Sequence, residues 1–171
     1  IVYTPLHGTG LVPVKRVLAE LGFKNVYVVP EQELPDPEFT TLAYPNPEDP
    51  AAFELAIKLA KEVGADIILA TDPDADRLGV RVKDKNGEYH DLTGNMSGCL
   101  LADYEISQRK ETQGLPADGK LIKTIVTSNL ADAIAKDYGV DLIEVLTGFK
   151  YIGQQILNFE TTGKGTYLFG F

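Results

Sequence analysis

Residues 51–71 read AAFELAIKLAKEVGADIILAT, and this stretch decides the fold class. The apolar residues of its first part recur at helical spacing and share one face: Phe53, Ala56, Ile57 and Ala60. Gly64 then stops the helix, and residues 66–70 follow as an apolar strand. An amphipathic helix that ends at a glycine before a buried strand is the repeating unit of α/β proteins.

The same unit occurs on both sides of this stretch. Before it, residues 1–29 run strand, loop, helix, strand, with Gly22 at the end of the helix. After it, residues 121–146 show the same order, with Gly139 at the end of the helix. This order favours parallel crossovers, and the continuous apolar strands suit sheets covered on both faces. We expect an α/β fold of two Rossmann-like, three-layer α/β/α domains with mostly parallel mixed sheets.

A hairpin is expected after the central strand. Residues 78–82 alternate between apolar and polar, and Asn86-Gly87 is a dipeptide typical of tight hairpin turns. Residues 88–92 should therefore pair antiparallel with residues 78–82. Residues 30–50, in contrast, contain many prolines and few periodic positions, which predicts a long connection.

The domain boundary is expected in the one linker-like stretch. Residues 94–108 are predicted as a helix, and residues 110–119, KETQGLPADG, follow it. We therefore expect a first domain over residues 1–113 and a second, truncated one over residues 114–171. The chain opens with isoleucine, its only methionine is Met96, and it stops just after an apolar run, so we expect an interior piece of a longer protein.

Composition narrows the classes of function. The chain has 171 residues, 44% of them hydrophobic, with 16 Lys+Arg against 25 Asp+Glu and a net charge of −9. This acidic balance argues against a nucleic-acid partner, since phosphate backbones attract basic surfaces. No apolar run approaches the roughly 20 residues of a membrane span, so no membrane partner is expected. The single cysteine, Cys99, excludes an internal disulfide and suits the reducing cytoplasm.

The sequence DPDADR, residues 72–77, follows the central strand directly. Asp72, Asp74 and Asp76 alternate in a loop bounded by a proline, so their carboxylates can converge on one point. Three such charges a few ångströms apart repel one another strongly without a cation. The loop therefore predicts a hard, oxygen-seeking metal, with Mg²⁺ favoured and coordination positions left for a phosphate oxygen and water.

The same loop has three other interpretations. An EF-hand counted from Asp72 needs glycine at its sixth position and glutamate at its twelfth, where the chain has Arg77 and Lys83. A haloacid-dehalogenase-type phosphatase needs Thr or Val where the chain has Asp76. A solvated acidic surface loop is the remaining alternative. Arg77 either holds a substrate phosphate bidentately or merely offsets the aspartates.

Further strand-end loops are expected at the same kind of edge, because ligands of open α/β sheets bind beyond the carboxyl ends of the strands. Residues 7–10, HGTG, half-match a dinucleotide fingerprint, but the third glycine should stand at Pro13. A tight turn before a helix explains Gly8-Thr9-Gly10 equally well. His7 is either a polar group of the site or a loop histidine with its hydrogen bonds satisfied.

Two more loops belong to this set, residues 127–129 and residues 147–150, TGFK. In the second, Thr147 is a natural N-cap, Gly148 permits close approach of a ligand, and Lys150 can reach a phosphate. Ordinary helix capping is the alternative. No serine has a histidine near it in sequence, so nothing supports hydrolase-type nucleophilic catalysis.

With these motifs in place, the chain resembles the phosphoglucomutase/phosphomannomutase group of the α-D-phosphohexomutase family. The resemblance rests on motifs spread along the whole chain: YTPLHGTG at 3–10, YPNPE at 44–48, TDPDADR at 71–77, LTGN at 92–95 and TGFK at 147–150. Members of the family have four domains, and this chain resembles the second domain and the beginning of the third.

The resemblance implies a mutase that interconverts hexose 1-phosphate and hexose 6-phosphate. A phosphoserine donates its phosphoryl group to the sugar, and the resulting 1,6-bisphosphate turns over and returns the other phosphate. It also implies a role for each matching residue: Asp72, Asp74 and Asp76 as Mg²⁺ ligands, Arg77 as a catalytic and substrate-binding residue, Thr147, Gly148, Phe149 and Lys150 as substrate-binding residues, and His7 and Gly8 at the rim of the site.

The implied partners are glucose 1- and 6-phosphate, possible mannose phosphates, and the remaining domains of the same polypeptide. The chain contains neither the Ser-His-Asn-Pro phosphoserine loop nor a Glu-Glu-Ser-type sugar loop, so we expect it to be inactive alone. Three alternatives stay open: a phosphopentomutase or phosphoglucosamine mutase of the same family, a non-catalytic sugar-phosphate- or nucleotide-binding module, and an NAD-dependent enzyme.

Overall fold

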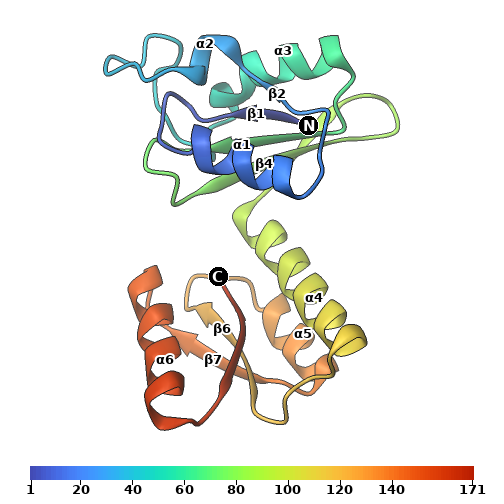
Figure 1. Ribbon diagram of the computed structural model, residues 1–171, viewed down its shortest axis with the longest axis vertical. Coiled ribbons are helices and arrows are strands. Elements are labelled where there is room, and N and C mark those ends of the chain that lie inside the picture. The colour runs from blue at the N-terminus through green and yellow to red at the C-terminus, as the bar shows by residue number, and fades with distance from the viewer. The chain divides into compact units, whose positions relative to one another are not determined.

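The computed structural model describes residues 1–171. The chain forms two compact units, Ile1–Gly94 and Asn95–Phe171 (Figure 1). No helix is long and apolar enough to span a membrane.

The first unit is built on a mixed five-stranded sheet in the order β2-β1-β3-β4-β5. In chain order the strands are β1 (Val2–Thr4), β2 (Tyr27–Val28), β3 (Ile67–Thr71), β4 (Leu78–Lys83) and β5 (Tyr89–Leu92). Strand β1 pairs in parallel with β2 and β3, whereas β4 pairs antiparallel with both β3 and β5. The β4–β5 pairing confirms the predicted hairpin.

Helices cover both faces of this sheet. They are α1 (Leu11–Glu20), α2 (Pro30–Glu33), the 3₁₀ turn η1 (Pro50–Phe53) and α3 (Glu54–Val63). Helix α1 lies on the opposite side of the strands from α2 and α3 (Figure 1). The predicted apolar face is confirmed, since Phe53, Ala56 and Ala60 are buried in one cluster with Val2 and Ile68. Helix α2 is a single turn within the connection expected over residues 30–50.

The second unit is a parallel sheet in the order β7-β6-β8 with helices on both faces. Its strands are β6 (Gly119–Thr124), β7 (Asp141–Val145) and β8 (Thr166–Gly170), and its helices are α4 (Gly94–Thr112), α5 (Leu130–Tyr138) and α6 (Phe149–Thr162). Leu121 packs with α4 and α5, whereas its neighbour Ile122 packs with α6. Alternate residues of β6 thus supply two cores, and the unit has three layers.

The division of the chain differs from the boundary expected at 113/114. It falls between Gly94 and Asn95, so nearly all of α4 belongs to the second unit. The cause is packing, because Ala102 and Ile106 of α4 are fully buried against Leu121 and Ala131. The polar, proline-containing residues 110–119 form a connection within the second unit.

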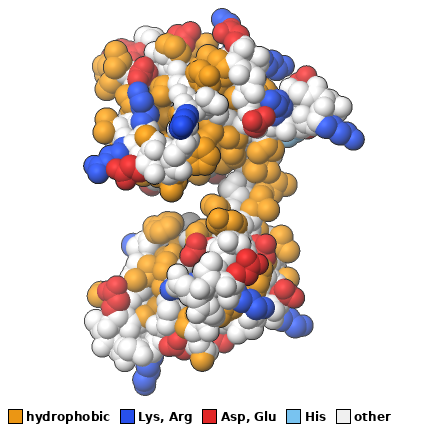
Figure 2. All heavy atoms as spheres, turned by 45° about the vertical axis from the view of Figure 1, so that its right-hand side comes forward, with side chains coloured by type: hydrophobic (Ala, Val, Ile, Leu, Met, Phe, Trp, Pro, Cys, Tyr) orange, Lys and Arg blue, Asp and Glu red, His pale blue; other side chains and the backbone are white.

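Charged side chains are dispersed over the face of the molecule that Figure 2 shows. On this face, lysines and arginines stand among acidic and apolar side chains in both units and form no broad basic area.

Candidate metal site at the acidic loop

Strand β3 delivers the acidic loop to the edge of the first sheet. Asp72 comes directly after the last residue of β3 and is 1% exposed. The Asp72 carbonyl accepts a hydrogen bond from the Ala75 N–H at 3.0 Å. Ala75 takes a left-handed conformation with a φ of 62°. This tight turn brings carboxylate oxygens of Asp72, Asp74 and Asp76 within 4.8 Å of one another. The convergence that the alternating spacing suggested is present.

Arg77 closes the loop by holding Asp72 twice. Its backbone N–H donates to Asp72 Oδ1 at 3.0 Å, and its Nε–H donates to Asp72 Oδ2 at 2.8 Å. Its Nε also lies 3.8 Å from Asp76 Oδ1. The three carboxylates and one guanidinium leave a formal charge of −3 + 1 = −2, which a divalent cation would neutralise. Each carboxylate oxygen accepts more than one partner, so Asp72 can still bind a cation.

The pKa values of the loop reflect this crowding. The charge of Asp74 raises the pKa of Asp76 above its ordinary value, with desolvation and the charge of Asp72 adding to the effect. Burial alone would raise the pKa of Asp72, but the backbone and side-chain hydrogen bonds from Arg77 outweigh it and lower that pKa overall. Mutual repulsion among fixed carboxylates is the situation that a bound cation relieves, so the donor set fits a hard divalent metal.

The segment Gly8-Thr9-Gly10 packs directly against this loop. A Cβ on Gly8 would overlap the backbone of Pro73, and a Cβ on Gly10 would lie 2.5 Å from the hydroxyl oxygens of both Thr71 and Tyr3. These two glycines are therefore needed for close packing. Close packing against the acidic loop explains why glycines stand at these two positions, so their spacing is not evidence for a dinucleotide-binding motif.

His7 faces inward and has both ring nitrogens bonded. It is 7% exposed; Nδ1 donates to the Leu34 carbonyl at 2.8 Å, and Nε2 lies 2.7 Å from Thr41 Oγ1. Because the carbonyl can only accept, Nε2 of a neutral ring accepts from the Thr41 hydroxyl. These contacts favour the interpretation of His7 as a satisfied loop histidine that anchors residues 34–41.

A pocket of about 430 Å³ opens beside Arg77. It is lined by Pro47, Glu48, Arg77, Leu78, Gly79, Val80, Asp91, Leu92, Thr93 and Gly94. Of these residues, only Arg77 was expected in a site. The YPNPE motif at 44–48 and the LTGN motif at 92–95 both contribute to the lining, and the two motifs were the signal that the sequence offered for it.

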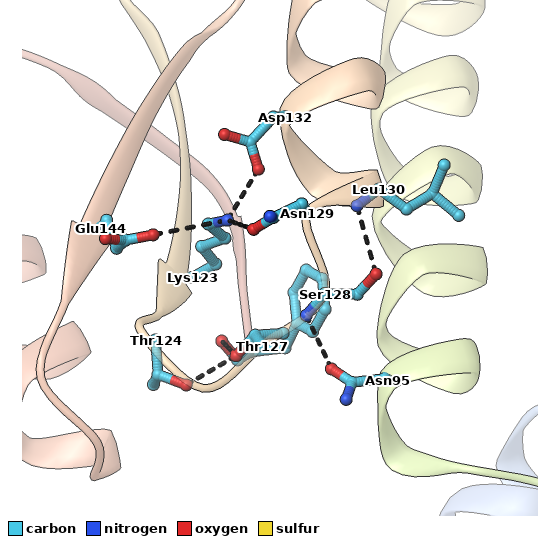
Figure 3. Close-up of polar contacts among 10 residues, drawn as sticks. Asn95, Lys123, Thr124, Thr127, Ser128, Asn129, Leu130, Asp132 and Glu144 are labelled. Carbon is cyan, nitrogen blue, oxygen red and sulfur yellow. Dashed lines mark hydrogen bonds and ion pairs between the residues drawn. The ribbon is translucent and has the colours of Figure 1, made fainter.

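In the second unit, the loops after β6 and β7 share one edge of the sheet because the two strands are parallel neighbours. Lys123, which is 1% exposed, supports the first of these loops by donating to Asn129 Oδ1 at 3.0 Å and Asp132 Oδ2 at 2.6 Å. Its Nζ also lies 3.4 Å from Glu144 Oε2. Figure 3 shows these three oxygens around one ammonium group. Lys123 was not among the residues expected to form a site.

Short polar contacts hold the rest of this loop. The Thr124 and Thr127 hydroxyls lie 2.6 Å apart, and the Asn95 side chain accepts from the Ser128 N–H at 2.8 Å (Figure 3). The Ser128 hydroxyl in turn accepts from the N–H of Leu130 at 3.1 Å, which caps the start of α5. The loop at 127–129 is thus fixed from three sides within its own unit.

The loop at 147–150 differs from its expectation at one residue. Thr147 does not cap the helix; the residue before α6 is Gly148, whose φ of 122° strongly favours glycine, and no side-chain cap bond forms. Phe149 is 70% exposed, and Lys150 Nζ lies 4.8 Å from the centre of the Tyr151 ring. Phe149 and Lys150 are exposed side chains on the first turn of α6.

The structure therefore places the predicted residues in two groups. Asp72, Asp74 and Asp76 form one cluster, Arg77 pairs with Asp72 and Asp76, and Gly8 packs against Pro73 of the same loop. The other group, residues 147–150, lies at the strand edge of the second unit.

Fold and loop together define an α/β/α protein with a carboxylate cluster at the carboxyl end of a sheet strand. Two family models match consecutive parts of this chain. Phosphoglucomutase/phosphomannomutase, alpha/beta/alpha domain II, matches residues 1–87, and the corresponding domain III matches residues 93–171. The chain belongs to the phosphoglucomutase/phosphomannomutase family.

Named relatives match along the chain. A phosphoglucomutase of Staphylococcus epidermidis is 40% identical over 171 residues, which are 100% of this chain and 30% of that protein. A Haemophilus influenzae protein named "Probable phosphomannomutase" is 44% identical over 153 residues, which are 90% of this chain and 30% of that protein. The chain thus spans about a third of the length of these relatives.

Solved structures share the fold. A phosphoglucomutase/phosphomannomutase family protein from Burkholderia thailandensis has a TM-score of 0.70 at 21% identity, covering 98% of this chain and 33% of that one. An N-acetylphosphoglucosamine mutase from Aspergillus fumigatus, in complex with GlcNAc-6P and magnesium, has a TM-score of 0.59 at 16% identity, covering 98% and 34%.

Proposed function

We propose that this chain is the metal-binding middle part of a phosphoglucomutase or phosphomannomutase. The observation that carries the proposal is the acidic loop, in which three carboxylates converge and Arg77 leaves a net charge of −2. Family membership and relatives named as mutases support the proposed reaction class. The substrates proposed are hexose phosphates, with glucose and mannose 1-phosphates first.

Each site residue has a role in this proposal. Asp72, Asp74 and Asp76 hold Mg²⁺, which when bound neutralises charge on the transferring phosphoryl group. Arg77 keeps Asp72 ionised and oriented, and its remaining N–H groups can hold a substrate phosphate.

The loop Thr147, Gly148, Phe149 and Lys150 is proposed to contact the sugar phosphate. The exposed Lys150 ammonium supplies a positive charge, and the conformation of Gly148 exposes backbone at the start of α6. Gly8 takes part by supporting the acidic loop, and His7 by anchoring the neighbouring segment. A cytoplasmic location belongs to the same proposal.

The decisive test is Asp74→Asn in the longer protein, assayed with glucose 1-phosphate, mannose 1-phosphate and ribose 1-phosphate. Removing one carboxylate should lower kcat by about a hundredfold or more, since several kcal/mol of charge stabilisation are lost. Asp49→Asn, outside the loop, serves as the matched control. Full activity of Asp74→Asn would exclude the proposed role of the loop.

The same assays separate the alternatives. A preference for ribose 1-phosphate would indicate a phosphopentomutase, and glucosamine phosphate can be added to test for a phosphoglucosamine mutase. A non-catalytic module would show no turnover in the longer protein, and Asp74→Asn would alter only its binding or stability. The 171-residue chain by itself is expected to be inactive, because it lacks the phosphoserine motif; turnover from the pure chain would contradict this.

A further inference from the structure

Two buried hydroxyl groups meet directly beneath the acidic loop. Tyr3, on strand β1 next to β3, has its hydroxyl 2.8 Å from Thr71 Oγ1, and the two residues are 0% and 5% exposed. Thr71 is the residue immediately before Asp72. Gly10 packs against both oxygens and leaves no space for a side chain. The point at which the chain enters the acidic loop is thus tied to the neighbouring strand β1.

A second tie lies one step further along the loop. The Pro73 carbonyl accepts hydrogen bonds from both the backbone N–H of Thr9, at 2.9 Å, and its hydroxyl, at 3.1 Å. This carbonyl belongs to the peptide group that joins Pro73 to Asp74. Two donors on one residue fix the plane of that peptide, and therefore the direction in which Asp74 leaves it.

The loop needs such support for two reasons. Ala75 adopts a left-handed conformation that is unfavourable for a residue with a side chain. The three carboxylates also repel one another, and this repulsion favours a more open loop. Contacts from the segment at 8–10 oppose both tendencies.

We propose that Tyr3 and Thr9 are positioning residues that hold the acidic loop in the arrangement that binds a divalent cation. This rests on the proposed function and adds to it the residues that set the affinity of its metal site. Neither side chain reaches the cation; Tyr3 acts through Thr71, and Thr9 acts through the Pro73 carbonyl. Outer contacts of this kind commonly change metal affinity by about 10- to 100-fold.

The experiment uses the 171-residue chain, with Mn²⁺ as a paramagnetic probe of the Mg²⁺ site and free Mn²⁺ counted by electron paramagnetic resonance. Tyr3→Phe removes one oxygen and keeps the ring, and Thr9→Val removes the hydroxyl and keeps the shape. Each should weaken Mn²⁺ binding by about tenfold. Thr9→Ser, which restores the hydroxyl, should recover most of the affinity.

Controls separate positioning from general destabilisation. Thr112→Val removes another hydroxyl that donates to a backbone carbonyl, 2.7 Å away in α4, and should leave Mn²⁺ binding unchanged. Thermal unfolding of every variant shows whether affinity falls in a folded chain. If Tyr3→Phe does not fold, the comparison of Thr9→Val with Thr9→Ser decides, because Thr9 lies on the surface.

Three outcomes would overturn the inference. If folded Thr9→Val and Tyr3→Phe bind Mn²⁺ as the unaltered chain does, the positioning role is excluded while the proposed function stands. If Thr9→Ser binds as weakly as Thr9→Val, the hydroxyl is not the cause. If the unaltered chain binds no Mn²⁺, or if Asp74→Asn binds it equally well, the metal site itself fails and the inference fails with it.

Discussion

Lys123 occupies a position on β6 where an apolar residue is the rule. Its side chain points to the face covered by α5, and its ammonium group is surrounded by oxygens of Asn129, Asp132 and Glu144. The hydrogen bond to Asp132 is the main cause that raises the pKa of Lys123 above 10.5. A buried charge of this kind is tolerated only because it is compensated within hydrogen-bonding distance.

Replacing Lys123 with methionine tests this compensation. Lys123→Met keeps the volume but leaves the Asn129 oxygen and two half-exposed carboxylates without their donor, so we expect a loss of about 1–2 kcal/mol in the free energy of unfolding at pH 8. The pKa is raised on folding, so the ion-pair contribution is complete below pH 10.5 and disappears as the pH rises beyond it.

Urea unfolding at a series of pH values from 8 to 11 measures this effect. The difference in the free energy of unfolding between Lys123→Met and the unaltered chain should shrink above pH 10.5. Taking this difference cancels the effect of ionising tyrosines, which both chains share. Lys85→Met, at an exposed lysine of the hairpin turn, is the matched control. A difference that stays constant over the whole range would show that packing, not charge, fixes Lys123.

At this scale the candidate site was predictable only in part. The alternation of Asp72, Asp74 and Asp76 after an apolar strand is a local pattern, and it led to the loop directly. The support from Gly8 and Thr9 was not predictable, because these residues are more than sixty positions from Pro73 and meet it only when β1 and β3 pair. Lys123 was overlooked because its partners come from two other elements.

Among the elements, the β4–β5 hairpin is held by one side chain in its turn. Asp84 Oδ1 accepts from the N–H groups of Asn86, at 2.8 Å, and Glu88, at 2.9 Å, and Oδ2 lies 3.1 Å from His90 Nε2. The Glu88 hydrogen bond, followed by that of His90, lowers the pKa of Asp84 to about 2. The turn therefore favours the ionised carboxylate.

We expect the Asp84 carboxyl to titrate near pH 2 in the folded chain. Because the pKa is lowered on folding from 3.8, its stabilising contribution is complete above about pH 4 and disappears as the pH falls towards 2. The ¹³C shift of the carboxyl carbon reports this titration. In His90→Ala the midpoint should rise but stay below 3.8, since the two N–H donors remain. A midpoint of 3.8 in the unaltered chain would show that the turn does not form these bonds.

Elements with strong periodicity were predicted well, and their ends less so. Helix α5 (Leu130–Tyr138) ends at Gly139 as expected, because its apolar face and the glycine after it are both local signals. Helix α4 extends to Thr112, beyond the expected end at 108. The start of α6 was assigned to Thr147 by capping preference, whereas the backbone uses Gly148 in a conformation that no propensity reveals.

At the scale of the whole molecule, the expected boundary at 113/114 shows what composition cannot reveal. Residues 110–119 are rich in polar and turn-forming residues, which is typical of a linker. The sequence of α4, however, gives no sign of which sheet its buried face contacts. In the structure that face meets β6 and α5, so the division lies ahead of α4, between Gly94 and Asn95.

A substitution at Ile106 distinguishes the boundary at 94/95 from the expected boundary at 113/114. Ile106 is fully buried in the cluster that contains Leu121 and Ala131, so Ile106→Ala should lower the stability of the second unit by about 2–5 kcal/mol. Amide hydrogen exchange should accelerate in β6 and remain slow in β3, because the cavity lies in one core only. Ile68→Ala, at a fully buried position of the first core, is the mirror-image control and should accelerate exchange in β3 while β6 is unaffected. Faster amide exchange of β3 in Ile106→Ala would show that α4 is stabilised together with the first unit, and would support the boundary at 113/114 instead.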